Sequence, residues 1–397
     1  MTGPLDGVRV LDLTQVQAGP SCTQLLAWLG ADVIKIEEPG KGDRTRWEMA
    51  DRPDVDSFYY LVFNANKRGI TLNLKSEQGV ALFKRLAAES DVVVENYAPG
   101  RMTGFGLGPE VLAEQFPRLV VASIKGFGSY GPDSHLKSYE NVAQAAGGAM
   151  STNGFGDRAP VFTSAGVGDS GSGLHCAIGI LAALRQRDQT GVAPSVEVSM
   201  QDAVLNLMRV RFVETLPTGE PVLRNGNQVW GSPDLVYPCL GGGPNDYVSM
   251  VIGGDAWDSL LAVAGRAELI GDERYATDGF RSERPDEVSE IVSAWTKTLT
   301  KDEVMRTLTD LGIPCSAVRD TAELMTDPHL RAREMMVEVS DSVRGDYTAI
   351  GCPIKIAGNA VDVTAPPLLS EHTDEVLGEV LGIDAHETAL LRKQGVV

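Results

Sequence analysis

The stretch that decides the fold is Val8-Arg-Val-Leu-Asp-Leu13, which leads through the apolar segment 22–29 to Val33-Ile-Lys-Ile-Glu37. The two short apolar runs are typical of buried strands, and segment 22–29 is typical of a helix. A strand, a helix and a second strand in this order predict a parallel sheet with ligands beyond the carboxyl ends of the strands. The dinucleotide-binding pattern Gly-x-Gly-x-x-Gly does not follow the first strand.

The rest of the chain repeats this alternation of strands and helices, and its composition then changes. Further strands are predicted at 67–75, 91–96, 119–124 and 195–200. Turn-rich residues from about 215 introduce a second, smaller α+β unit at 228–312, with a strand at 247–252. The apolar helices predicted near 373–381 and 385–394 need a core, so we expect them to return to the larger domain. The sequence therefore predicts an α/β fold with two domains.

Composition limits the partners. The 397 residues carry a formal net charge of −19, which argues against nonspecific binding to nucleic acid or to an anionic membrane. No apolar run approaches the roughly 20 residues of a membrane span. The five cysteines have no metal-ligand spacing, so we expect reduced thiols, no metal and a cytoplasmic location.

One carboxylate stands in a glycine-rich segment, Gly166-Val-Gly-Asp-Ser-Gly-Ser-Gly173, directly before an apolar helix. Asp169 is therefore either a helix cap or a nucleophile at a strand-to-helix turn, and its carboxylate is expected to be ionised near pH 7. Gln17, just past the first strand, is likewise either a helix cap or a ligand contact. Several basic residues lie on the predicted loops at one sheet edge and suit a phosphate-bearing ligand: Lys67, Arg68, Lys75, Arg101, Lys125 and Lys137. A second cluster, Lys41, Arg44 and Arg46, is interpreted as a solvated loop.

Several motifs together resemble CoA-transferase family III. They are Pro4-Leu-Asp-Gly7, Gln17-Ala-Gly-Pro20, Gly30-Ala-Asp32, Asn64-Ala-Asn-Lys-Arg68, Val167-Gly-Asp-Ser170 and Glu371-His-Thr-Asp-Glu375. Lys137-Ser-Tyr-Glu140 and Gly312-Ile-Pro-Cys315 are similar to the formyl-CoA:oxalate branch of that family. The resemblance implies a Rossmann-like large domain and an interlocked homodimer. It also implies a CoA thioester as substrate, small carboxylic acids as partners, and no permanently bound cofactor.

The resemblance divides the chain further. Residues 1–212 would be the CoA-binding large domain, which carries Asp169, and 333–397 its C-terminal return. Linkers at 213–227 and 313–332 would flank the small domain at 228–312.

The resemblance also assigns roles. Asp169 matches the nucleophile, which would form an aspartyl anhydride and then an aspartyl-CoA thioester. Gln17 would donate to the oxyanion, and Gly241 and Gly242 would form a glycine lid that shields the anhydride. The acid pocket would use Tyr59, Tyr139, Glu140 and Trp47. Contacts to CoA would come from Gln15, Ala18, Leu72, Lys75, Asn96, Tyr97, Arg101 and Lys137.

Several features depart from the formyl/oxalate pattern. Glu38 stands where a basic residue is expected, Trp47 comes one place early, and segment 212–245 is short. The alternatives are a transferase of another acid pair, an α-methylacyl-CoA racemase, or an inactive acyl-CoA-binding protein. The racemase branch needs an adjacent His-Asp pair, and Tyr139-Glu140 stands in its place here.

Overall fold

The computed structural model describes residues 3–228, 233–254 and 256–397. The chain folds into two units. The larger unit contains residues 1–151, 162–222 and 329–397, and the smaller contains residues 152–161 and 223–328.

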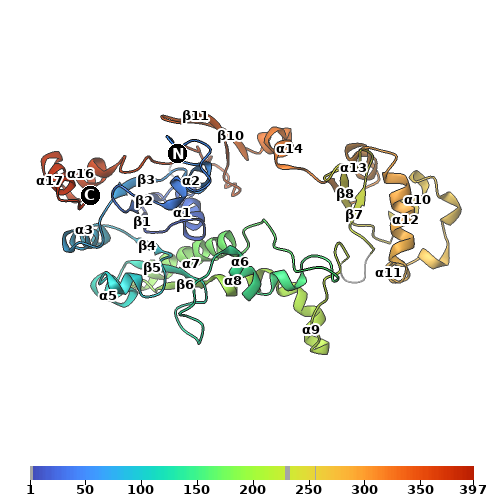
Figure 1. The fold of residues 1–397 in the computed structure, drawn as a ribbon, viewed down its shortest axis with the longest axis horizontal. Coiled ribbons are helices and arrows are strands. Elements are labelled where there is room, and N and C mark those ends of the chain that lie inside the picture. The colour runs from blue at the N-terminus through green and yellow to red at the C-terminus, as the bar shows by residue number, and fades with distance from the viewer. Residues whose placement is uncertain (1–2, 229–232, 255) are drawn as a thin grey trace. The chain divides into compact units, whose positions relative to one another are not determined.

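The larger unit is built on a six-stranded parallel sheet of strand order β3-β2-β1-β4-β5-β6 (Figure 1). Its strands are β1 (Arg9–Asp12), β2 (Asp32–Glu37), β3 (Arg68–Thr71), β4 (Val92–Glu95), β5 (Val120–Lys125) and β6 (Val196–Ser199). The predicted α/β class and parallel sheet are confirmed. The strand order changes direction between β1 and β4, and sheets of this kind bind ligands at that point, beyond the carboxyl ends of the strands.

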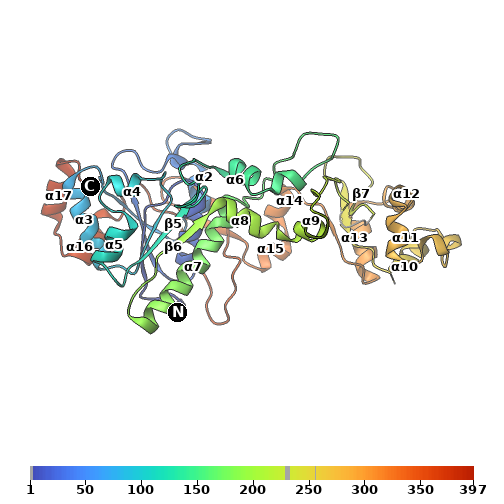
Figure 2. The same cartoon turned by 90° about the horizontal axis from the view of Figure 1, so that it is seen from below.

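Helices cover both faces of this sheet (Figure 2). Helices α1 (Ala18–Trp28) and α7 (Asp169–Thr190) pack on one face, and α3 (Glu77–Ala88) and α5 (Pro109–Gln115) on the other. Shorter helices are α2 (Phe58–Asn64), α4 (Arg101–Gly104), α6 (Glu140–Ala146), α8 (Met200–Leu207), α9 (Phe212–Thr218), η1 (Arg44–Arg46), η2 (Ala149–Thr152) and η3 (Arg209–Arg211). The inner strands β1, β4 and β5 are buried from both sides, which explains their largely apolar sequences.

The β3 edge of the sheet is covered by the C-terminal segment. Helices α16 (Thr373–Leu381) and α17 (Ala385–Lys393) lie near α3 in Figure 1. His372 and Gly69 exchange two hydrogen bonds: the Gly69 amide donates to Nδ1 at 3.1 Å, and the His372 amide donates to the Gly69 carbonyl at 2.9 Å. The Asn73 amide donates to the Val396 carbonyl at 2.8 Å. These bonds satisfy backbone groups that an open sheet edge would leave exposed.

The smaller unit has an antiparallel sheet of order β7-β8-β9, formed by β7 (Val236–Pro238), β8 (Tyr247–Met250) and β9 (Cys315–Ala317). Its helices are α10 (Ala256–Val263), α11 (Asp278–Ser282), α12 (Pro285–Thr296), α13 (Lys301–Asp310), α14 (Thr321–Thr326), η4 (Ala267–Leu269) and η5 (Glu273–Tyr275). Helix α15 (Pro328–Ala332) and the hairpin β10 (Met336–Asp341) and β11 (Gly345–Ile350) lie where the chain returns to the larger unit.

Two expected boundaries differ from the structure. Residues 313–332 were expected to be a linker, but β9 pairs with β8 and belongs to the small sheet. Residues 152–161 were expected in the large domain, but Phe155 forms an antiparallel bridge with Asn225 in the smaller unit. Both differences arise from backbone pairing between segments distant in sequence, which local composition does not encode.

Helices α1 and α7 approach closely because Gly173 lacks a side chain. A Cβ on Gly173 would lie 2.1 Å from Ser21 Oγ and 2.7 Å from the Ala18 carbonyl oxygen. Gly173→Ala should therefore destabilise the protein by about 1–3 kcal/mol, as overpacking does. Thermal melting measures the loss. Gly104→Ala is the matched control, because a Cβ there meets no atom within 4 Å. An unchanged melting temperature in Gly173→Ala would contradict this close packing.

Candidate active site

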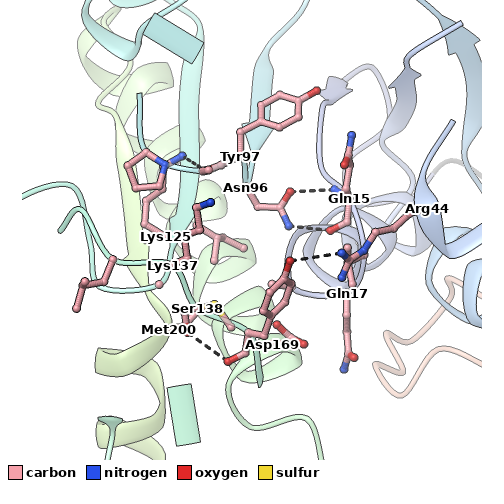
Figure 3. A pocket seen from close by; sticks show the side chains of 18 residues that line it. Gln15, Gln17, Arg44, Asn96, Tyr97, Lys125, Lys137, Ser138, Asp169 and Met200 are labelled. Carbon is pink, nitrogen blue, oxygen red and sulfur yellow. Dashed lines mark hydrogen bonds between the residues drawn. The ribbon is translucent and has the colours of Figure 1, made fainter. Parts of the chain in front are cut away.

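A cavity of about 230 Å³ lies at the carboxyl edge of the parallel sheet (Figure 3). Loops after β1, β4 and β5 form its walls, together with the first residues of α7 and α8. The cavity is lined by Gln15, Val16, Gln17, Ala18, Arg44, Asn96, Tyr97, Ala98, Pro99, Ile124, Lys125, Gly126, Leu136, Lys137, Ser138, Tyr139, Asp169 and Met200. It therefore occupies the region where the strand order predicts a ligand.

Asp169 is the first residue of α7, and the carboxylate of Glu140 caps this helix in its place. The amides of Gly168 and Asp169 donate to Glu140 Oε1 and Oε2 at 2.9 and 2.5 Å. Gln144 Nε2 donates to Glu140 Oε1 at 2.7 Å and holds it. Within the described part of the chain, no residue donates a hydrogen bond to the carboxylate of Asp169. That carboxylate therefore remains available for chemistry.

The environment of Asp169 disfavours its charge. Burial and the nearby negative charge of Glu140 raise its pKa from its ordinary value of 3.8 to about 7. The expectation that it is fully ionised near pH 7 is therefore wrong, because the sequence does not reveal the burial or the second carboxylate. Burial raises the pKa of Tyr59 to about 12, and the negative charge of Asp169 adds to this shift. The phenol of Tyr59 therefore stays protonated close to Asp169.

The raised pKa predicts a pH profile. Only the ionised carboxylate is nucleophilic, so the rate of acylation of Asp169 should rise with pH through about 7. Glu140→Gln removes a negative charge that raises the pKa, so the midpoint should move to lower pH. Single-turnover acylation rates between about pH 5 and 9 measure it.

Glu114→Gln, at an exposed position of α5, is the control and should leave the midpoint unchanged. A midpoint that does not respond to Glu140→Gln would contradict this electrostatic coupling.

Gln17 points across to α7. It occupies the N-cap position of α1 but makes no side-chain cap bond, and its Nε2 donates to Ser170 Oγ at 3.1 Å. A Cβ on Gly166 would lie 2.5 Å from this nitrogen, so the amide fits against a bare backbone. Gln17 thus places a hydrogen-bond donor beside the residue that follows Asp169.

The other glycines of the segment have a packing role. A Cβ on Gly168 would meet Ala143 Cβ at 2.9 Å, and one on Gly171 would meet Leu207 Cδ1 at 2.7 Å. Protein atoms therefore already occupy the space that a side chain on either glycine would need.

The predicted site residues fall into four groups. Eight line the cavity: Gln15, Gln17, Ala18, Asn96, Tyr97, Lys137, Tyr139 and Asp169. Tyr59 and Glu140 are close to Asp169 but do not line the cavity. Four lie outside its lining: Trp47, Leu72, Lys75 and Arg101. Gly241 and Gly242 belong to the smaller unit, where both have positive φ, 117° and 72°.

Two of the residues outside the lining, Lys75 and Arg101, contact other side chains. Lys75 Nζ binds Glu38 Oε1 at 2.5 Å, so the acidic departure at position 38 neutralises this lysine. The guanidinium of Arg101 lies 4.8 Å from the ring centroid of Phe105.

Arg44 was missed by the sequence interpretation, which placed it in a solvated loop. It lines the cavity, and its Nη1 donates to the hydroxyl of Tyr139 at 3.4 Å. Its neighbour Arg46 is buried instead and binds Glu37 and Asp56. The two arginines lie on a short 3-10 turn that directs one side chain to the cavity and the other into the core. The composition of the loop does not predict this difference.

Two features are absent from the described residues. No helix among them is long and apolar enough to cross a bilayer. No group of three or more histidine, cysteine or acidic side chains within residues 3–228, 233–254 and 256–397 is arranged to hold a metal ion.

Comparison with known proteins gives a consistent result. The sequence profile described as CoA-transferase family III matches residues 5–373. A formyl-CoA:oxalate CoA-transferase of Streptomyces avermitilis is 45% identical and covers 100% of both chains. One from Streptomyces coelicolor is 45% identical over 99% of each chain. The crystal structure of a CAIB/BAIF family protein from Brucella suis is similar with a TM-score of 0.83 and 29% identity, covering 96% of this chain and 100% of that one.

Proposed function

The chain belongs to CoA-transferase family III, and on this premise we propose that it transfers CoA from formyl-CoA to oxalate, giving formate and oxalyl-CoA. The observation that carries the proposal is the carboxylate of Asp169, which receives no hydrogen bond from the described residues and faces the cavity beside Gln17. Full-length relatives at 45% identity that are named formyl-CoA:oxalate CoA-transferases support the choice of acids.

In the first half-reaction a carboxylate oxygen of Asp169 attacks the thioester carbonyl carbon of formyl-CoA. The carbon–sulfur bond breaks, and the products are a formyl aspartyl anhydride and CoA thiolate. The thiolate then attacks Cγ of Asp169, which releases formate and leaves an aspartyl-CoA thioester.

In the second half-reaction a carboxylate of oxalate attacks the aspartyl thioester and displaces CoA thiolate. The thiolate attacks the oxalyl carbonyl of the new anhydride, which forms oxalyl-CoA and regenerates the carboxylate of Asp169. Each step forms one bond and breaks one, so no external acid or base is consumed.

The remaining cavity residues suit supporting roles. Gln17 Nε2 donates to the oxyanion of each tetrahedral intermediate. Arg44 and Lys137 supply positive charge for the anionic acid and for CoA. Gly241 and Gly242 have positive φ values, which suit a glycine turn in the smaller unit.

We also propose a homodimer with interlocked subunits. Leu174, Ile178 and Leu181 form an exposed apolar stripe at helical spacing on α7, and Ile178 is 66% exposed. Such a stripe on a long helix that begins at the active site suits burial by a second copy of the chain. Sedimentation equilibrium should give twice the mass of 42.4 kDa. A monomeric mass would exclude the dimer.

A panel of donors and acceptors tests the proposed acids. The purified protein is incubated with formyl-, succinyl- or acetyl-CoA and with oxalate, succinate or acetate, and the thioesters are separated by chromatography. Formyl-CoA with oxalate should give the highest kcat/KM. A preference for another pair would overturn the acids but retain CoA transfer. CoA binding without a covalent adduct on Asp169 would overturn the enzymatic function.

A further inference from the structure

Side chains bind the backbone amides and carbonyls of Thr14 and Gln15 in the turn between β1 and α1. The Thr14 amide donates to Asp12 Oδ1 at 2.9 Å, and the Thr14 carbonyl accepts from Lys35 Nζ at 3.0 Å. The amide and carbonyl of Gln15 both bind the side chain of Asn96, at 2.9 and 2.8 Å. The turn is therefore fixed from outside rather than by its own backbone bonds.

The next residue, Val16, is held in a conformation that it does not favour. Its φ is 68°, in the left-handed region. Other non-glycine residues of the described ranges share a positive φ, but none of them is β-branched, and a β-branched residue there is strained. The amide of Val16 donates to Asp43 Oδ2 at 3.2 Å. Its neighbours must therefore maintain this geometry.

Val16 and its turn are bound by a buried ion pair, Lys35 and Asp43. Lys35 Nζ lies 3.1 Å from Asp43 Oδ2, and both side chains have no exposed surface. Burial opposes the charge of Lys35, but the nearby carboxylates of Asp43, Asp12 and Glu37 raise its pKa, so the ammonium persists. This ammonium binds the Thr14 carbonyl, and its partner Asp43 binds the Val16 amide. One buried pair thus grips the turn at two points.

Gln17 follows Val16 directly, so the turn sets the direction of its side chain toward Ser170. We propose that Lys35 and Asp43 are positioning residues, which hold Val16 in the left-handed conformation and thereby aim Gln17 Nε2 at the reacting atoms beside Asp169. This inference rests on the proposed role of Gln17 as the oxyanion donor. It assigns a purpose to a buried ion pair that no step of the reaction touches.

Asp43 has a second contact that the experiment must separate. Its Oδ1 accepts from the amide and hydroxyl of Thr45, both at 3.0 Å, and so caps η1, which carries Arg44. A loss of activity in an Asp43 variant could therefore act through Arg44. Glycine at position 16 distinguishes the two routes, because it adopts a positive φ without strain but changes nothing at Arg44.

The test is a double-mutant cycle. Asp43→Asn in the wild-type background should lower kcat roughly 10- to 100-fold, since small displacements of a catalytic group have effects of this size. The KM for the CoA thioester should stay within about 2-fold. In the Val16→Gly background the same substitution should lower kcat less than about 3-fold, because glycine at position 16 adopts a positive φ without the hydrogen bond from Asp43. An equal loss in both backgrounds would overturn the proposal.

Asp32→Asn is the matched control. Asp32 lies on the same strand as Lys35, but at the amino end of that strand, where it pairs with Arg9 and Arg68. It should change kcat less than about 2-fold in either background. If Asp43→Asn leaves Lys35 as a buried unpaired charge and does not fold, Lys35→Met combined with Asp43→Asn removes both charges together. The cycle is then measured with that pair.

Crystal structures of the same variants supply a readout that does not depend on activity. In Asp43→Asn, φ of residue 16 should become negative, and the 3.1 Å bond from Gln17 to Ser170 should be lost. That bond should return in the double variant with Val16→Gly. An unchanged φ and an intact bond in Asp43→Asn would overturn the positioning role, even if the wild-type enzyme proved inactive with formyl-CoA and oxalate.

Discussion

Asp169→Asn should abolish CoA transfer, with kcat lowered on the order of 10⁴-fold or more. The amide is nearly isosteric with the carboxylate but cannot form the anhydride. Glu140, not the side chain of Asp169, caps α7, so the helix should keep its start and the protein its melting temperature. Initial rates of thioester exchange measure the loss. Mass spectrometry after incubation with formyl-CoA should show no covalent adduct.

Asp188→Asn provides the control on the same helix, because Asp188 is a surface carboxylate that pairs with Arg187. It should retain full activity and the adduct on Asp169. CoA should still bind to Asp169→Asn, as isothermal titration would show. Turnover of Asp169→Asn near the wild-type value would remove Asp169 as the nucleophile.

Gln17→Ala should lower kcat by about 10²- to 10³-fold, the usual cost of removing one oxyanion donor. Gly166→Ala should approach the same loss by a different route. Its Cβ would lie 2.5 Å from Gln17 Nε2 and would push the amide out of place. The atom displaced is the end of a flexible side chain, so the melting temperature should change little. Steady-state kinetics with formyl-CoA and oxalate compare the two variants.

The effects of the two substitutions on kcat should not be additive. Because both remove the same donor, the double variant should be no slower than Gln17→Ala alone. Gln186→Ala, on the exposed side of α7, is the control for loss of an amide and should retain wild-type kcat. Independent, multiplying effects in the double variant would show that Gly166 does not act through Gln17.

The sheet was predictable because its strands are short apolar runs separated by helices of clear composition, as in Val8–Leu13 and Val33–Glu37. The start of α7 was not. The apolar helix was predicted to follow Gly173, whereas the structure begins α7 at Asp169. Glycines 168, 171 and 173 hide the helical signal, and the cap comes from Glu140, 29 residues away. Local sequence does not contain a cap supplied at that distance.

The site shows the same division. The position of Gln17 and Asp169 at this sheet edge could be predicted, because Gln17 directly precedes α1 and Asp169 stands in the glycine-rich segment at the start of α7. The pKa of Asp169 could not, since it depends on burial and on a second carboxylate from α6. Arg44 and Arg46 are two residues apart in one loop, yet one lines the cavity and the other is buried against Glu37 and Asp56. Only the folded turn distinguishes them.

The covering of the β3 edge has a consequence for biosynthesis. Gly69 on β3 binds His372, which follows it by 303 residues. During translation β3 therefore leaves the ribosome long before the segment that completes its hydrogen bonds, and the whole smaller unit is synthesised in between. Throughout that interval the nascent chain presents an unpaired strand edge, the kind of surface on which aggregation begins. The rate of translation between residues 72 and 372 sets how long this edge stays uncovered.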